Sequence, residues 1–333
     1  MRCILPLSFL MFLSLTLNAA ESADCSRGDC ENGSGTMTWT DGSVYTGEWK
    51  NGLRHGRGRY LRPEGDAYEG EWRNDRMHGS GTLARPNGSR YEGQWLNNHR
   101  HGKGRYFFLD GRKYDGDWKN DRIDGTGRMA WPNGEIYSGS WKEDRMHGNG
   151  SFTFSDGSMY RGGWAFGRMH GRGEYAYSRG MNYVGQFRES RRNGTGVMTW
   201  PDGSRYEGLW VDDRMSGKGT LKRGDGAIYT GEMKNDKKNG DGEMKFADGR
   251  QYRGQFTDDV INGTGGMRWP DGRFYTGSWR NGEMHGVGTM KYRDGREYRG
   301  EWQNGEMHGK GTLTVPNAKP VTGLWENGEL VGN

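Results

Sequence analysis

Hydrophobic and polar residues alternate along most of the chain, and the alternation recurs at a fixed distance. In the first clear example Tyr45, Gly47 and Trp49 alternate with the polar residues Thr46 and Glu48. A period of two residues predicts a β-strand with one ring-bearing face. The tyrosine then recurs every 23 residues without an insertion, at Tyr45, Tyr68, Tyr91, Tyr114, Tyr137, Tyr160, Tyr183, Tyr206, Tyr229, Tyr252, Tyr275 and Tyr298. This spacing predicts a repeat array in which each unit buries its apolar face against its neighbours.

A second short strand is predicted before each tyrosine. Most repeats have a pair such as Asp41-Gly42 four residues before the tyrosine, and these pairs tolerate positive φ and favour hairpin turns. Before the turn, Met37 and Trp39 again alternate with polar residues. Each repeat is therefore predicted to be one β-hairpin. The predicted fold class is all-β, an elongated single-layer antiparallel sheet of tandem hairpins.

Glycines complete the predicted hairpins. Gly47 lies on the ring-bearing face, where we expect it to leave room for an aromatic ring of the neighbouring repeat. After Trp49, the segment from Asn51-Gly52 through Gly58 is predicted to be a second connection. Its glycines would let the backbone fold back to start the next hairpin.

These features together resemble a known repeat. The succession of Tyr-x-Gly-x-Trp, Asn-Gly or Asn-Asp, His-Gly-x-Gly and Asp-Gly is similar to the MORN (membrane occupation and recognition nexus) repeat, from Asn32 to about Gly328. The resemblance implies an elongated sheet without catalytic residues or a cofactor of its own. Members of the family resemble adaptors, and binding to phosphoinositides or other acidic lipids has often been proposed for them. The resemblance also leaves open a homodimer formed through the C-terminal repeats.

The N-terminus has the pattern of a secretory signal peptide. Met1-Arg2 precedes an apolar run, Ile4 to Leu17, and small residues follow as far as Ala23. We expect residues 1–22 to be removed, so that the protein is secreted or lies in the lumen of the secretory pathway. The alternative is an uncleaved segment that anchors the protein in the membrane, although the run is shorter than the ~20 residues of a spanning helix.

The rest of the chain is predicted to have three parts. Residues 23–32 form a short N-terminal cap, residues 33–328 form the repeat array, and residues 329–333 form a tail. The cap contains Cys25 and Cys30. In an oxidising compartment two such close thiols are expected to form a disulfide.

A histidine recurs in the His-Gly-x-Gly segment, at His55, His78, His101, His147, His170, His285 and His308. Consecutive histidines are expected to lie one hairpin, about 10 Å, apart, which is too far to share a metal with ligand bonds of about 2 Å. Other repeats have Asp, Asn or Ser there, so we predict a structural role in hydrogen-bonding a turn. No nucleophile, base and orienting group stand outside the repeat register. The sequence predicts no enzyme, metal or cofactor.

Two residues before the histidine position a basic residue recurs. We call this set the basic column: Arg76, Arg122, Arg145, Arg168, Arg191, Arg214 and Lys237. The sign reverses at Glu283, Glu306 and Glu329. We expect these residues to be exposed in loops along one edge of the sheet, with their charge partly cancelled by Asp75, Asp121, Asp144, Asp213 and Asp236. They would either form a solvated edge that prevents edge pairing or a strip that binds an acidic partner.

Charge and residue type narrow the choice of partner. The balance of 48 Lys and Arg against 43 Asp and Glu argues against nucleic acid. Acidic phospholipids concentrate on the cytoplasmic leaflet, away from a secreted chain. Glycan binding by the aromatic face is a further alternative, and Arg62, Arg85 and Arg223 replace rings there and could contact tryptophans. We expect a non-catalytic scaffold that presents a long surface to a protein partner, with an acidic phospholipid membrane as the alternative partner.

Overall fold

The computed structural model describes residues 23–332, so the predicted signal peptide lies outside the described residues. The described part of the chain contains 28 β-strands and no helix. The prediction of an all-β antiparallel fold is confirmed. The described residues divide into two compact units, with the boundary between Arg168 and Met169.

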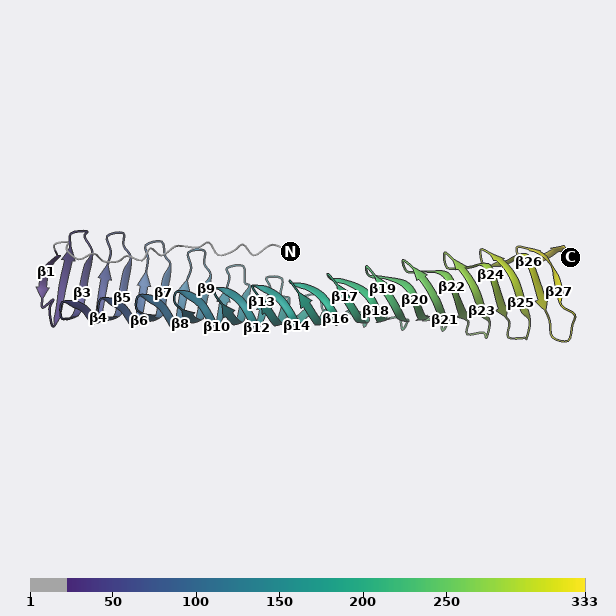
Figure 1. Ribbon diagram of the computed structural model, residues 1–333, viewed down its shortest axis with the longest axis horizontal. Helices are drawn as coiled ribbons and strands as arrows, with labels where there is room; N and C mark the ends of the chain where they lie inside the picture. Colours follow the sequence, from purple (N-terminus) through teal and green to yellow (C-terminus); the bar gives the residue numbers. More distant parts are fainter. Residues whose placement is uncertain (1–22, 333) are drawn as a thin grey trace. The chain divides into compact units, whose positions relative to one another are not determined.

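In the first unit, each strand pairs antiparallel with the strands before and after it, in chain order (Figure 1). Its strands are β1 (Ala23–Gly28), β2 (Ser34–Trp39), β3 (Val44–Lys50), β4 (Leu53–Leu61), β5 (Ala67–Arg73), β6 (Arg76–Ala84), β7 (Arg90–Leu96), β8 (His99–Phe107), β9 (Lys113–Lys119), β10 (Arg122–Ala130), β11 (Ile136–Lys142), β12 (Arg145–Thr153) and β13 (Met159–Ala165). The segment predicted as a cap contributes a strand, because β1 pairs with β2.

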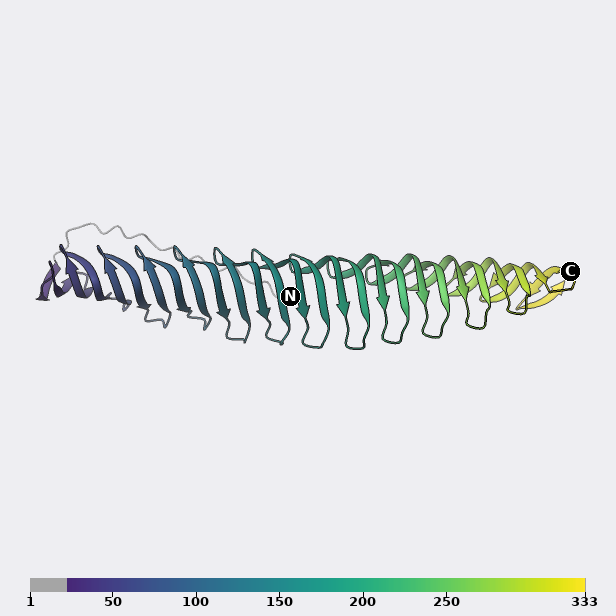
Figure 2. The same cartoon turned by 90° about the horizontal axis from the view of Figure 1, so that it is seen from below.

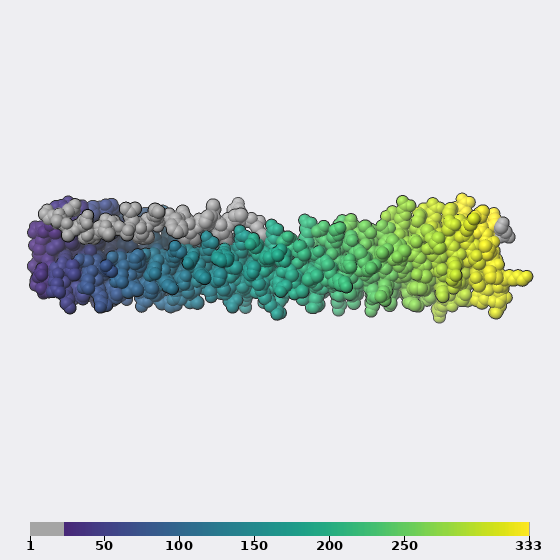
Figure 3. All heavy atoms as spheres, viewed as in Figure 1, coloured from purple at the N-terminus to yellow at the C-terminus, as the bar shows by residue number. Residues whose placement is uncertain are grey.

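The second unit repeats the same order and pairing, and its side chains form a continuous surface in the space-filling view (Figure 3). Its strands are β14 (Arg168–Ala176), β15 (Asn182–Arg188), β16 (Arg191–Thr199), β17 (Arg205–Val211), β18 (Arg214–Lys222), β19 (Ile228–Lys234), β20 (Lys237–Lys245), β21 (Gln251–Thr257), β22 (Val260–Arg268), β23 (Phe274–Arg280), β24 (Glu283–Lys291), β25 (Glu297–Gln303), β26 (Glu306–Thr314), β27 (Val321–Glu326) and β28 (Glu329–Gly332). The segment predicted as a tail thus pairs with β27 as a short strand.

The turn before each tyrosine forms where the sequence predicts it. The N–H of Gly42 donates to the carbonyl oxygen of Trp39 at 2.9 Å, and Met37 then lies opposite Tyr45 in the β2–β3 ladder. This register places the apolar residues of both strands on one face of the sheet. The hairpin is therefore the unit that the alternation predicts.

The second connection is shorter than the sequence predicted. Only Asn51 and Gly52 separate β3 from β4, and these turns lie on the edge opposite the Asp-Gly turns (Figure 2). The loop prediction through Gly58 was wrong because the glycines belong to the strand. Gly56 has a φ of 54° where the β3–β4 register shifts, and Gly58 lies opposite Gly47. The histidine position thus lies inside a strand, next to a β-bulge.

The repeat tyrosines form the core on one face of each unit. Tyr45 is completely buried, and its hydroxyl donates to the carbonyl oxygen of Glu48 at 3.0 Å. The ring covers Gly47 and Gly58, since a Cβ on Gly58 would lie 2.2 Å from the tyrosine oxygen. Gly47 therefore accommodates the tyrosine of its own strand, and Gly58 accommodates the same tyrosine from the next strand. The prediction that Gly47 faces a ring of the neighbouring repeat was wrong.

Tyrosines and tryptophans of successive repeats pack edge to face. The ring centroids of Tyr45 and Trp49 are 5.0 Å apart, and those of Tyr45 and Trp72, in the next repeat, are 5.4 Å apart. The indole N–H of Trp72 also donates to the carbonyl oxygen of Gly58 at 3.2 Å. Each such ring pair contributes about 0.5–1.5 kcal/mol beyond the burial of its area. We call this series of buried rings the aromatic ladder, and it joins each hairpin to the next.

Candidate functional site

The basic column begins alternate strands. Arg76 is the first residue of β6, Arg122 the first of β10 and Lys237 the first of β20, and each directly follows a tight turn. All seven side chains of the column are exposed. The prediction of exposure is confirmed, whereas the prediction of loop residues was wrong because the second connection has only two residues.

The aspartates near the basic column have other partners. The carboxylate of Asp213 accepts the backbone N–H of Arg192 at 3.0 Å, and that of Asp236 accepts the N–H of Met215 at 2.7 Å. In both cases the aspartate of one turn accepts a hydrogen bond from the preceding repeat. The donor is the residue that directly follows the basic-column residue of that repeat.

Two residues of the basic column form long ion pairs, Arg122 with Glu143 at 3.7 Å and Arg191 with Asp212 at 3.9 Å. Burial raises the pKa of Asp144, and the charge of Arg122 is among the groups that lower it. The charge of the column is therefore partly offset there, as the sequence suggested.

The residue after the basic column belongs to the ring-bearing face. Three repeats have arginine there, and each guanidinium lies over a ladder tryptophan: Arg54 at 4.4 Å from the Trp72 centroid, Arg100 at 4.3 Å from Trp118 and Arg192 at 4.3 Å from Trp210. The Nη2 group of Arg192 also donates to the backbone oxygen of Asp213 at 2.7 Å. The ion pair between Arg192 and Asp213 compensates the guanidinium charge, which lies partly within the core.

Sequence reasoning missed these inner cations. It offered Arg62, Arg85 and Arg223 as residues that could contact tryptophans, and of these Arg223 forms an ion pair with Asp225 at 3.6 Å. The available signal was a charged residue in a position that other repeats fill with Met or Ile, such as Met215 and Ile261. When one repeat has a charged residue at a position that is apolar in the others, the charge is expected to have a paired group on the buried face.

The histidines of the described residues lie inside strands, next to the β-bulges. The Nδ1 atoms of His55, His78 and His101 are buried without a hydrogen-bond partner, so the predicted bond to a turn is absent at these atoms. Asp124, at the same position, does accept the N–H of the turn residue Glu143 at 3.3 Å. Within residues 23–332, no three His, Cys, Asp or Glu side chains are grouped closely enough to hold a metal ion.

The first strand is covalently tied to the turn that follows it. Cys25 in β1 and Cys30 form a disulfide, with their Cα atoms 6.1 Å apart. Cys30 is buried, whereas Cys25 and the rest of β1 are exposed. The bond therefore attaches an otherwise exposed edge strand to the first complete hairpin.

A row of half-buried rings runs beside the aromatic ladder in each unit. These rings precede the Asp-Gly turns, and we call them the outer rings: Trp39, Phe108, Trp131 and Phe154 in the first unit, and Tyr177, Trp200, Phe246, Trp269 and Tyr292 in the second. All of them are half-buried, whereas the repeat tyrosines are at most 2% exposed. The outer rings are therefore a part of the aromatic face that a partner can reach.

Several outer rings are held in place by an arginine. The guanidinium of Arg273 lies 5.3 Å from the centroid of Trp269, and its Nε donates to a carboxylate oxygen of Asp271 at 2.8 Å. The backbone N–H of Arg273, and then its guanidinium, lower the pKa of Asp271. The carboxylate thus stays ionised and fixes the arginine beside the ring. This arrangement gives preorganised, amphipathic contact points.

Comparison with known proteins decides the family. Thirteen segments match the MORN repeat, at residues 31–44, 45–67, 68–90, 91–111, 114–136, 137–159, 160–181, 183–205, 206–228, 229–249, 252–272, 275–295 and 298–317. The chain is a MORN-repeat protein. The resemblance stated from the sequence is confirmed, and the last hairpin of this MORN-repeat protein, β27–β28, extends the sheet beyond the matched segments.

A search of curated proteins finds no match to this MORN-repeat protein. Among solved structures, the TCP10 domain of Danio rerio CPAP is 12% identical and covers 72% of this chain and 96% of its own, with a TM-score of 0.28. The same domain in complex with a peptide of Danio rerio STIL is 14% identical over 79% of this chain and 96% of its own, with a TM-score of 0.23. Virginiamycin B lyase from Staphylococcus aureus is 11% identical over 92% of this chain and 89% of its own, with a TM-score of 0.14. These values support no argument about function.

No helix in residues 23–332 has the length and hydropathy to cross a membrane.

Proposed function

We propose that this MORN-repeat protein is a non-catalytic scaffold that binds a protein partner through its outer rings, in the secretory-pathway lumen or outside the cell. The observation that supports the proposal is the contrast between two kinds of ring in one repeat. Tyr275 and Trp279 are buried in the ladder, whereas Trp269 is half-buried on the same face. Aromatic residues dominate the binding energy of protein interfaces. The location rests on the sequence of residues 1–22 and on the Cys25–Cys30 pair.

The test is photo-cross-linking capture of partners from the organism's secretory fraction. A variant with Phe246→Ser, Trp269→Ser and Tyr292→Ser should capture about tenfold less partner than the wild type, because each substitution removes a ring contact. A matched variant of the same unit, with Arg191→Gln, Arg214→Gln and Lys237→Gln, should capture the partner as the wild type does. Equal capture by the ring variant and the wild type would refute the proposal.

The alternative function is binding to an acidic phospholipid membrane, which the exposed basic column favours. Each exposed Lys or Arg contributes about 1 kcal/mol near an anionic surface, and salt screens this attraction. If the column binds membranes, replacing Arg191, Arg214 and Lys237 by Gln should weaken binding to phosphatidylserine vesicles on the order of 100-fold. The matched control replaces Glu283, Glu306 and Glu329 in the same column by Gln, which should not weaken binding. If the wild type does not bind these vesicles at physiological salt, the membrane alternative is excluded.

A second copy of the chain is a further candidate partner, through the C-terminal repeats. Among the described strands, β28 is paired with β27, and its other edge can pair with another strand. Light scattering of the wild type and of a variant lacking residues 318–333 would show whether this edge forms a dimer. A monomeric wild type would exclude it.

A further inference from the structure

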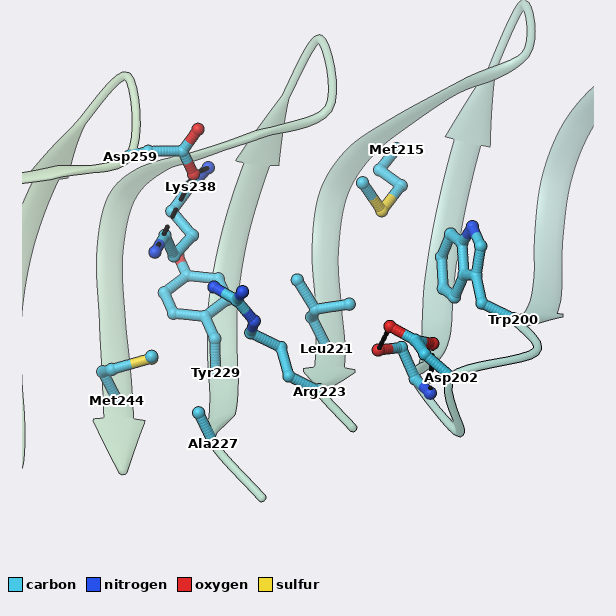
Figure 4. Close-up of a pocket in the computed structure, with 11 residues that line it drawn as sticks. Trp200, Asp202, Met215, Leu221, Arg223, Ala227, Tyr229, Lys238, Met244 and Asp259 are labelled. Atoms are coloured by element: carbon cyan, nitrogen blue, oxygen red, sulfur yellow. Dashed lines mark hydrogen bonds and ion pairs between the residues drawn. The ribbon is translucent and has the colours of Figure 1, made fainter. Parts of the chain in front are cut away.

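An open hollow of about 470 Å³ lies on the ring-bearing face of the second unit (Figure 4). Its apolar lining includes the indole of Trp200, the side chains of Met215, Leu221 and Met244, and the ring of Tyr229. Arg223, Lys238, Asp202 and Asp259 add charged groups. The hollow therefore combines an apolar floor with charged side chains.

The hollow lies where most other repeats have a ring, although Arg62 and Arg85 also replace it. An outer ring packs on the apolar residue two positions before it, as Phe108 does on Tyr106 with centroids 4.4 Å apart. It also reaches the equivalent residue of the next repeat, as Trp131 reaches Phe152 at 5.6 Å. At residue 223 an arginine replaces the ring. The two residues that a ring would cover are Leu221 and Met244, and both line the hollow.

The arginine of this repeat also occupies a different position from the arginines of other repeats. In four other repeats an arginine four residues after the outer ring lies over it, at 4.5 to 5.3 Å from the ring centroid: Arg112, Arg250, Arg273 and Arg296. The equivalent residue here is Ala227. The side chain of Arg223 is 59% exposed and pairs with Asp225 at 3.6 Å. This repeat therefore has a cation beside the hollow and no ring of its own for that cation to face.

We propose that the hollow binds one aromatic side chain from an extended segment of the protein partner. The ring lies on Leu221 and Met244 beside the indole of Trp200, and the guanidinium of Arg223 faces it. This inference rests on the proposed function and names the chemistry of one contact. A cation favours an aromatic over an aliphatic side chain. The carboxylates of Asp202 and Asp259 disfavour an acidic one, and Lys238 already pairs with Asp259 at 3.9 Å.

The experiment titrates the blocked peptide Ac-Gly-Trp-Gly-NH2 into the full chain with ¹³C-labelled methionine methyl groups. We expect saturable shifts of the Met215 and Met244 methyl resonances. Met290 is the internal control, because its repeat has Tyr292 in the outer ring position. The Arg223→Trp variant supplies the missing ring and should abolish the shifts, while Arg223→Gln keeps the hollow and should weaken binding about fivefold.

Two outcomes would overturn the proposal. One is an equal shift of the Met215 and Met244 methyl resonances in the wild type and in Arg223→Trp, provided that denaturation curves show both proteins to be folded. The other is binding of Ac-Gly-Leu-Gly-NH2 or Ac-Gly-Glu-Gly-NH2 as tight as that of the tryptophan peptide. Failure here is distinguishable from failure of the scaffold function, because partner capture is measured with the variant at Phe246, Trp269 and Tyr292, and none of these residues lines the hollow.

Discussion

Each repeat tyrosine combines a buried ring with one hydrogen-bonded hydroxyl. Burial raises the pKa of Tyr206 to about 12 and that of Tyr252 to about 12. The hydroxyl of Tyr206 donates to the carbonyl oxygen of Leu209 at 3.1 Å. The folded chain therefore holds these phenol protons more tightly than the unfolded chain does, and the ladder requires the neutral form.

This difference predicts unfolding at alkaline pH. Above pH 10 the unfolded chain loses phenol protons that the folded chain keeps, so the free energy of unfolding falls by about 1.4 kcal/mol per pH unit for each such tyrosine. Stability should be complete below pH 10 and decrease between pH 10 and 12. Tyrosinate absorbance and tryptophan fluorescence should change together in one steep transition. If the tyrosinate absorbance rises fully while the fluorescence remains native, the repeat tyrosines are not buried.

The two kinds of ring predict different costs of truncation in one repeat. Trp279→Ala should lower the free energy of unfolding by about 3–5 kcal/mol, because it removes a buried ring that packs against Tyr252 and Tyr275. Trp269→Ala should cost about 1 kcal/mol, because this ring is half-buried. Denaturant titration of both variants measures the difference. Similar costs would mean that the outer rings stabilise the fold and are not reserved for binding.

At the scale of the strand, the alternation of residues predicted the hairpins and their register. It did not predict the second connection, because a glycine-rich segment resembles a loop until pairing is known. Gly58 is required by the tyrosine ring that covers it, and Gly56 by the bulge. The inner cations were missed for a related reason. Whether Arg192 lies on the ring-bearing face depends on the register shift between Arg192 and Gly196, which the period alone does not reveal.

The disulfide of β1 gives a prediction at the same scale. All six residues of β1 are exposed, so its attachment depends on the ladder to β2 and on the Cys25–Cys30 bond. Closing so short a loop contributes about 2 kcal/mol in the chain-entropy model. Replacing both cysteines by Ser should speed hydrogen exchange of β1 amides without changing that of β3. Unchanged exchange in β1 would show that the bond does not hold the strand.

Throughout residues 23–332, the repeats of each unit are joined through the strands of the repeats next to them. Each hairpin contributes one link of the ladder and two strands of the sheet, and each strand pairs only with adjacent strands. In such arrays stability is close to a sum of repeat and interface terms. The scaffold function follows from this arrangement, because repeats can differ at the outer rings without changing the core. The hollow beside Arg223 is one such difference.

The most direct test of this claim deletes one repeat. Removing residues 206–228 joins Arg205 to Tyr229 and keeps the 23-residue register. Hydrogen exchange should then show the same protected amides in β14–β16 and β20–β28 as in the full chain. Removing only residues 206–217 leaves an odd number of strands and should unfold the flanking repeats, because the ring-bearing faces no longer align. Loss of protection across the second unit after the whole-repeat deletion would contradict the account.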